Sequence, residues 1–121
     1  MEGYSVINYK NKQIHIVDYS VLNKSKEKTI KLIQYATEQY KNLPKDSVLA
    51  IVNAENFYFD MDILKVFKEE GAKTAPYEKK VAVIGVKGLI KAAYNFVVGL
   101  TRNNYKVMNS EAEAKEWLIK D

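Results

Sequence analysis

The chain has no cysteine and only one histidine among its 121 residues. The lack of cysteine excludes disulfides, thiolate metal sites and cysteine nucleophiles, and it is compatible with a reducing cytoplasm, where we expect the protein to reside. The histidine, His15, has no potential ligands at metal-binding spacing, and nucleophilic triads lack a suitably placed base. We therefore predict that His15 is an ordinary strand residue, that the protein holds no metal or cofactor, and that it is not an enzyme.

Long hydrophobic runs are also missing from the chain. No segment approaches the roughly 18 consecutive apolar residues that cross a bilayer, and the most apolar region, residues 89–100, is interrupted by Lys91 and Asn95. The N-terminal sequence MEGYSVINYK has no basic stretch followed by an apolar one. We expect neither a signal peptide nor a transmembrane segment, while peripheral contact with lipid stays open.

Arginine is nearly absent, since Arg102 is the only one among 19 lysine and arginine residues. Sequence-specific DNA-binding proteins favour arginine, because its guanidinium group makes bidentate contacts with guanine. The formal net charge of +4 is a mild, lysine-based excess, which is typical of a solvated surface. We expect no nucleic-acid partner.

Local patterns predict the order β-β-α-β-α-β-α-β-α in one domain over residues 1–121. Asn11 suits a hairpin turn, Ser25, Asp60 and Ser110 suit helix N-caps, and Gly71 suits a helix end. Continuous apolar runs at 48–52 and 81–84 indicate strands covered on both faces, so we predict an α/β fold with a mixed, mainly parallel sheet and an N-terminal β-hairpin. The expected strands are 4–9, 13–19, 48–52, 81–84 and 105–108, and the expected helices are 25–42, 60–71, 89–100 and the segment after 110.

The stretch from Val81 to Gly99 has the form of a strand, a glycine pair and a helix, as in phosphate-binding loops. A Walker loop requires four residues between its glycines and then a lysine and a hydroxyl residue. Gly85 and Gly88 are too close for this pattern, and Lys91 occupies the position of the third glycine of a dinucleotide-binding fingerprint. We expect no nucleotide binding, and we interpret the glycines as sites of sharp turning and close packing.

The element order, together with "KVAVIGVKGLIKAAYNFVVGLT" and "VMNSEAEAKEWL", resembles the STAS/SpoIIAA-like family of small bacterial proteins. The resemblance implies the fold, and many members of this family have no assigned activity. Its anti-sigma-factor antagonists carry a phosphorylatable serine, preceded by aspartate, where the helix after the third strand begins. The corresponding stretch here, "NAENFYFDMD" at 53–62, has neither serine nor threonine. A serine-phosphorylation switch is therefore not expected there, while a looser likeness to lipid-transfer domains leaves lipid binding as an alternative.

The candidate site lies at the carboxyl ends of the strands expected at 48–52 and 81–84. If these strands are parallel neighbours, both following loops meet at one edge of the sheet. The asparagines would supply hydrogen bonds, Lys87 a charge, and two exposed aromatic residues contact area, unless the asparagines only satisfy loop backbone. The candidate partner- or ligand-binding residues are Asn53, Glu55, Asn56, Phe57, Tyr58, Gly85, Lys87 and Gly88.

Two functions follow as expectations. The first is a non-catalytic binding or regulatory module that acts through protein partners or self-association, and the second is a small-ligand or lipid-headgroup binder. Acidic Glu55, Asp60 and Asp62 weigh against an anionic ligand. The expected helix at 89–100 is apolar almost all round, so Tyr94 and Val98 are candidates for a homodimer contact, with helices on both sheet faces as the equal alternative.

Overall fold

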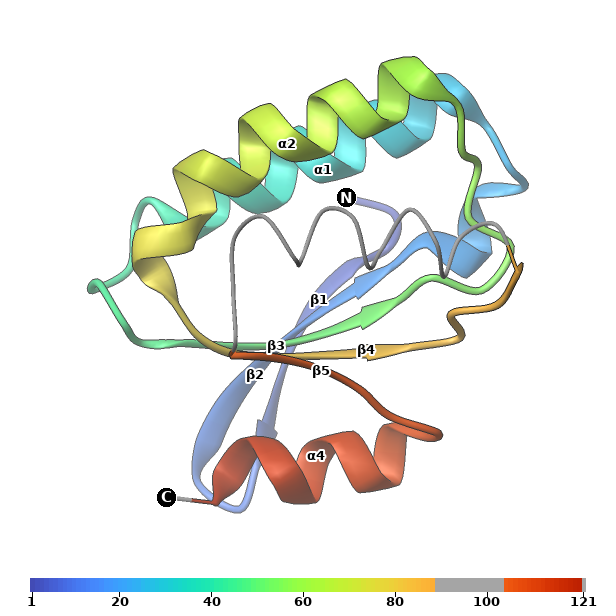
Figure 1. The fold of residues 1–121 in the computed structure, drawn as a ribbon. Coiled ribbons are helices and arrows are strands. Elements are labelled where there is room, and N and C mark those ends of the chain that lie inside the picture. Colours follow the sequence, from blue (N-terminus) through green and yellow to red (C-terminus); the bar gives the residue numbers. More distant parts are fainter. Residues whose placement is uncertain (89–103, 121) are drawn as a thin grey trace.

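The computed structural model describes residues 1–88 and 104–120, which build one five-stranded sheet with helices on both faces (Figure 1). The strand order is β1-β2-β3-β4-β5. The first pair is antiparallel and all other neighbours are parallel, as the sequence predicts. The strands are β1 Tyr4–Tyr9, β2 Lys12–Asp18, β3 Val48–Asn53, β4 Glu78–Ile84 and β5 Tyr105–Val107.

In the described part of the chain, helices cover both faces of the sheet (Figure 1). Helices α1 and α2 lie side by side over one face, and α4 lies against the other (Figure 1). The described helices are α1 Lys26–Tyr40, α2 Met61–Thr74 and α4 Glu111–Ile119, with short 3-10 helices η1 Tyr19–Leu22 and η2 Ala75–Tyr77. The expected helix at 89–100, with Tyr94 and Val98, lies outside the described residues.

The β1–β2 hairpin closes through a two-residue turn. Lys10 and Asn11 have φ angles of 47° and 70°, and Tyr9 pairs with Lys12. Positive φ at both central residues gives the backbone twist that matches two antiparallel strands. The predicted hairpin is therefore confirmed, and its register continues without a shift from Tyr4 to Tyr9.

All three predicted N-caps are confirmed. The side-chain oxygens of Ser25, Asp60 and Ser110 accept hydrogen bonds from backbone N–H groups three residues later, at 3.2, 2.9 and 3.2 Å. Each bond satisfies one of the donors that a helix leaves free at its first turn. These caps fix where α1, α2 and α4 begin.

The predicted end of the second helix was wrong, because α2 continues through Gly71 to Thr74. Glycine weakens a helix interior but does not interrupt it. The Gly71 carbonyl accepts hydrogen bonds from the Ala75 N–H and, at 3.2 Å, from the Thr74 hydroxyl. Pro76, which has no N–H to donate, follows directly and coincides with the change to η2.

The side chains of β3 point alternately to the two faces of the sheet, and the core accordingly has two layers. Val48 and Ala50 pack toward α1 and α2, whereas Leu49 and Ile51 pack toward α4. All four side chains are buried, which explains the continuous apolar run in the sequence. The remaining fully buried anchors include Leu22, Leu32 and Ile63 in the first layer and Ile14, Ala114 and Leu118 in the second.

Candidate functional site

The carboxyl ends of β3 and β4 lie side by side, as expected from the sequence. Asn53 pairs with Ile84, and the Ala54 N–H donates to the Ile84 carbonyl at 2.9 Å. The loops that follow these strands therefore leave the sheet together. The geometry brings Asn53 and Glu55 of one loop next to Gly85 of the other.

At Gly85 the two loops approach each other closely. Its φ is +75°, and a Cβ at this position would lie 2.8 Å from the Glu55 nitrogen and 2.9 Å from Asn53 Oδ1. Neither the conformation nor the space suits another residue. Gly88 also has a positive φ of +56°. Both glycines thus have the conformational role expected from the sequence, with close packing added at Gly85.

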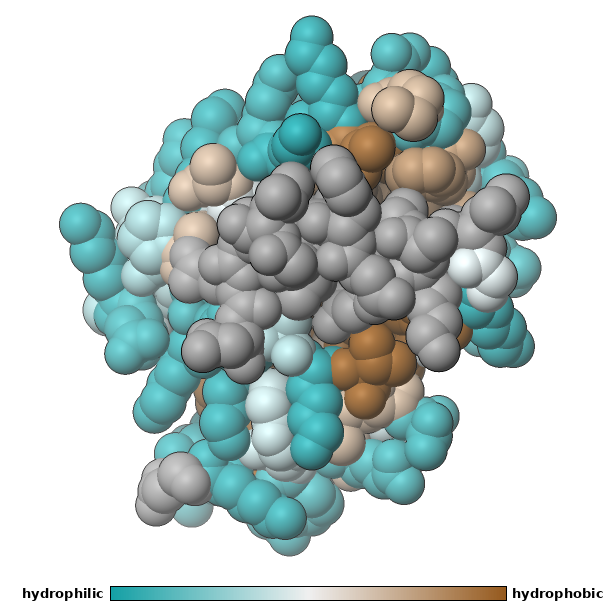
Figure 2. Space-filling model, in the orientation of Figure 1, coloured by the Kyte–Doolittle hydropathy of each residue, from teal (hydrophilic) through white to brown (hydrophobic). Residues whose placement is uncertain are grey.

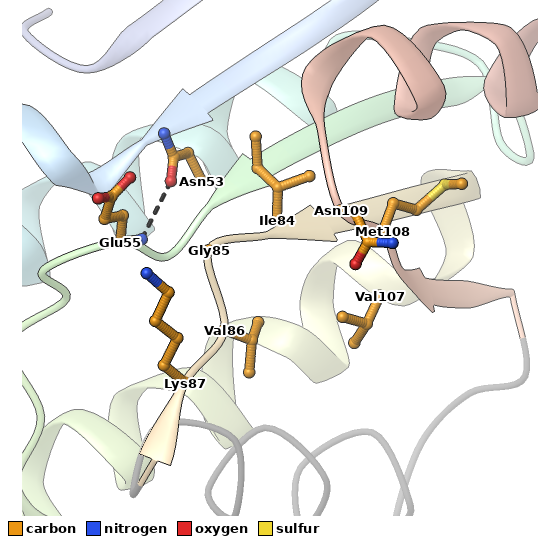
Figure 3. Close-up of a pocket in the computed structure, with 9 residues that line it drawn as sticks. All are labelled: Asn53, Glu55, Ile84, Gly85, Val86, Lys87, Val107, Met108 and Asn109. Atoms are coloured by element: carbon orange, nitrogen blue, oxygen red, sulfur yellow. Dashed lines mark hydrogen bonds between the residues drawn. The ribbon is translucent and has the colours of Figure 1, made fainter.

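A hollow of about 280 Å³ lies beside these loops (Figure 3). In this view the Lys87 side chain extends toward the Asn53–Glu55 loop, and Met108 points away from Lys87. The hollow combines amide, carboxylate and ammonium groups with aliphatic side chains. It is lined by Asn53, Glu55, Ile84, Gly85, Val86, Lys87, Val107, Met108 and Asn109.

Sequence reasoning missed the three residues that the end of β5 contributes to the hollow, Val107, Met108 and Asn109. Val83 pairs with Val107 in parallel, so β5 ends at the same edge of the sheet as β4. A signal existed, because 105–108 was expected to be a strand of the same mainly parallel sheet. The strand order, which the sequence does not show, was needed to place it beside β4.

The two asparagines shape the loop after β3. Asn53 Oδ1 accepts a hydrogen bond from the Glu55 N–H at 3.0 Å. Asn56 has a φ of 56°, in the left-handed region that asparagine tolerates better than most residues. Asn53 thus supports loop backbone and also lines the hollow, whereas Asn56 has a conformational role of its own.

The expectation of two exposed aromatic residues was wrong for Phe57. Its side chain is 9% exposed and packs edge-on against Tyr19, with ring centroids 4.8 Å apart. Phe57 also packs against Phe67, with ring centroids 5.3 Å apart. Tyr58 is half-buried, and its hydroxyl donates to Asp60 Oδ2 at 2.8 Å. This stretch therefore anchors the loop in the core instead of presenting an aromatic pair.

Asp60 joins the N-termini of α1 and α2. It accepts hydrogen bonds from the Ile63 N–H and the Tyr58 hydroxyl, and Lys26 Nζ lies 2.9 Å from its Oδ2. The Ile63 hydrogen bond, followed by those of Lys26 and Tyr58, lowers the pKa of Asp60 to about 2. Lys26 also lies 2.7 Å from Asp62, and hydrogen bonds to Asp62 and Asp60 raise the pKa of Lys26.

His15 is a strand residue in the core, as predicted. It is buried on β2, and its Nδ1 lies 2.7 Å from the Tyr4 hydroxyl. Burial lowers the pKa of His15. Across residues 1–88 and 104–120, no group of three or more His, Asp or Glu side chains could hold a metal ion. No helix within these same ranges is both long and apolar enough to span a membrane.

The surface gives a further indication of what this region contacts. On the face drawn in Figure 2, most of the described surface is hydrophilic, and hydrophobic residues form small separate groups. Around the candidate site, Glu55 and Lys87 are exposed. Val107, which also lines the hollow, is 43% exposed, so the accessible part of the site combines charged groups with an apolar side chain.

Comparison with known proteins identifies one solved structure of the same architecture. It is an anti-sigma-factor antagonist (STAS) domain protein from Planctomyces limnophilus, with a TM-score of 0.63 over 97% of this chain and 98% of that one. The sequences are 6% identical, so the likeness concerns the fold. No family model and no curated protein matches the sequence. The chain has a STAS-like fold, as the resemblance in its sequence implies.

Proposed function

We propose that this chain is a non-catalytic regulatory module that binds a protein partner through the carboxyl edge of its parallel strands. The observation that carries the proposal is the meeting of three strand ends, those of β3, β4 and β5, around exposed charged side chains. Open α/β sheets bind their ligands at this edge. The similar solved structure is named as an anti-sigma-factor antagonist domain, which supports a regulatory role exerted by binding.

The charges of the edge favour a partner with a basic surface. Glu55 is exposed in the loop after β3, and the Asp62 side chain, 74% exposed, follows at the start of α2. Lys26 lies against Asp60 and Asp62, and this neutralises part of the acidic charge. Lys87 adds one positive charge beside Glu55 (Figure 3). Such a mixture of charges gives orientation and specificity in protein contacts.

The small-ligand alternative rests on the hollow itself. Its volume of about 280 Å³ falls just below the range of roughly 300–1,000 Å³ that is common for small-molecule sites. The side-chain amide oxygen of Asn53, Oδ1, already accepts a hydrogen bond from the backbone N–H of Glu55. Saturable binding of glycerol phosphate in calorimetry, lost in Lys87→Glu, would favour a lipid-headgroup binder over the protein-binding module.

The stretch 53–62 has no serine or threonine, so we infer that partner binding is not switched by serine phosphorylation there. We place the module in the cytoplasm. Self-association through Tyr94 and Val98 stays a prediction, since these residues lie outside the described part of the chain.

Charge reversal tests the proposed surface. We expect Glu55→Lys to weaken capture of a native partner from lysate, whereas Glu69→Lys on the exposed side of α2 leaves it unchanged. Circular dichroism confirms that both variants fold. Quantified capture at full strength by a folded Glu55→Lys/Lys87→Glu variant would show that the partner binds elsewhere.

A further inference from the structure

The two outer strands of the sheet differ in how they are protected from pairing with another strand. β5 has three residues and carries Lys106 at its centre. β1 has six residues, none of them charged or proline, and pairs with β2 without a bulge. Natural sheets protect their edges with short strands, lysine, proline or bulges. β1 has none of these devices, so its outer edge is suited to receive a further strand.

The outward hydrogen-bonding groups of β1 follow from its pairing with β2. Asp18 N–H donates to the Gly3 carbonyl at 2.7 Å, and such bonded pairs alternate along an antiparallel ladder. Tyr4, Val6 and Asn8 therefore direct their backbone groups away from β2. The Tyr4 N–H donates to the Met1 carbonyl at 3.2 Å. The Tyr4 carbonyl and both groups of Val6 and Asn8 remain directed at the edge.

We propose that β1 pairs antiparallel with β1 of a second copy of this chain across a two-fold axis through Val6. An axis perpendicular to the sheet keeps α1 and α2 of both copies on one side, so residues opposite each other must come from the same face. With Val6 opposite Val6, Tyr4 faces Asn8 of the second copy. This register uses both backbone groups of Val6, the Asn8 N–H and the Tyr4 carbonyl, while the Tyr4 N–H keeps its bond to Met1, and it makes one continuous sheet from two.

Charge complementarity favours a second copy as the occupant. Glu2 precedes β1 and Lys10 follows it, and both are exposed. Glu2 and Lys10 lie in the turns that flank β1, so antiparallel pairing brings Glu2 of each copy to the end of the paired strands where Lys10 of the other lies, whereas parallel pairing would bring like charges together. In the single chain, Glu2 lies 3.4 Å from Lys28 and Lys10 lies 2.9 Å from Glu116, both in exposed pairs. The side chain at the centre, Val6, is 46% exposed and would lose contact with water.

This interface is separate from the proposed protein-binding site. β1 borders β2 at one side of the sheet, whereas the candidate site is built from the ends of β3, β4 and β5. Failure of one proposal therefore leaves the other standing.

Disulfide cross-linking tests the register directly, because the natural chain has no cysteine. We expect Val6→Cys to form a covalent dimer rapidly under mild oxidation, since two residues facing across a bonded pair lie about 5.5 Å apart at Cα. Two Asn8→Cys residues would be offset by four positions, roughly 13 Å along the strand, and should not be bridged. Val21→Cys, on an equally exposed valine of η1, reports random collision.

Charge variants at the same position test the two-fold axis. We expect Val6→Lys and Val6→Glu each to raise the dimer dissociation constant about ten-fold or more in analytical ultracentrifugation, because like charges then face each other. Mixing the two variants should restore the dimer. Val21→Lys is the matched control, and circular dichroism checks folding.

Three results would overturn the proposal. They are a wild-type chain that stays monomeric over the whole concentration range, a Val6→Cys variant that cross-links no faster than Val21→Cys, and a mixture of Val6→Lys with Val6→Glu that stays monomeric. If Val6→Lys instead abolishes capture of a different protein by a monomeric chain, the edge receives a foreign strand and self-pairing is wrong.

Discussion

Gly85 lies against the backbone of Glu55 so closely that a single added carbon would reach 2.8 Å from the Glu55 nitrogen. The contact joins the loop after β3 to the loop after β4. Because the obstructing atom is backbone, it cannot move aside as the end of a side chain can. The close approach of these loops, and with it the shape of the candidate site, depends on a glycine at this position.

Gly85→Ala should therefore lower the free energy of unfolding by about 2 kcal/mol or more, since the variant combines a clash with a left-handed backbone. Chemical denaturation measures the loss. The control is Gly71→Ala inside α2, where an added Cβ meets nothing within 4 Å. That variant should raise the free energy of unfolding by roughly 0.5–1 kcal/mol. Equal effects at the two glycines would contradict the role assigned to Gly85.

Phe57 supports the candidate site from inside the core. Removing its ring leaves a cavity beside Tyr19 and Phe67. We expect Phe57→Ala to lower the free energy of unfolding by about 3–5 kcal/mol. Tyr58→Phe removes only the hydroxyl that donates to Asp60. It should lower the free energy of unfolding by clearly less than Phe57→Ala does. A small effect of Phe57→Ala in denaturation would mean that Phe57 is a surface residue after all.

The parts of the fold that the sequence predicts are those with local causes. Ser25, Asp60 and Ser110 cap helices within three residues of themselves, and Asn11 forms its turn with its neighbour. Each signal and its structure lie in the same short segment. The meeting of the two loops at the sheet edge was expected on the condition that β3 and β4 are parallel neighbours, and the structure meets this condition.

The predictions from sequence failed where residues that are distant in the sequence, or competing local signals, determine the structure. Phe57 is buried because Tyr19 and Phe67 meet it, and neither contact is visible in the segment 53–62. Gly71 resembles a helix end, yet α2 continues to Thr74, and η2, which contains Pro76, begins at Ala75. The contribution of β5 to the hollow required the order of strands. Packing between segments that are far apart in sequence cannot be read from local pattern.

Asp60 makes stability depend on pH in an acidic window. Its pKa in the folded chain is about 2, below the ordinary value of 3.8, because the ionised form accepts the Ile63 hydrogen bond and contacts Lys26 and Tyr58. This contribution is complete above about pH 4 and is lost as the pH falls toward 2. Asp60→Asn keeps a capping oxygen but has no charge to titrate. We expect the stability of the variant, measured by denaturation, to fall less than that of the wild type across this window; parallel curves would contradict the assignment.

His15 makes stability depend on pH in a second window. Because the chain has no other histidine, its imidazole gives the only histidine titration that NMR would observe. Burial disfavours the charged imidazolium, so the pKa of His15 lies below its ordinary value of 6.5. The unfolded chain therefore takes up a proton first, and the stability contributed by neutral His15 is complete above pH 6.5 and lost below it. Proton NMR should give a titration midpoint below 6.5 in the folded chain. Tyr4→Phe removes the hydroxyl beside His15 Nδ1 but leaves the imidazole buried among its neighbours. The titration midpoint of His15 in this variant should therefore stay below 6.5. A midpoint at or above 6.5 in the wild type would show that water reaches the imidazole.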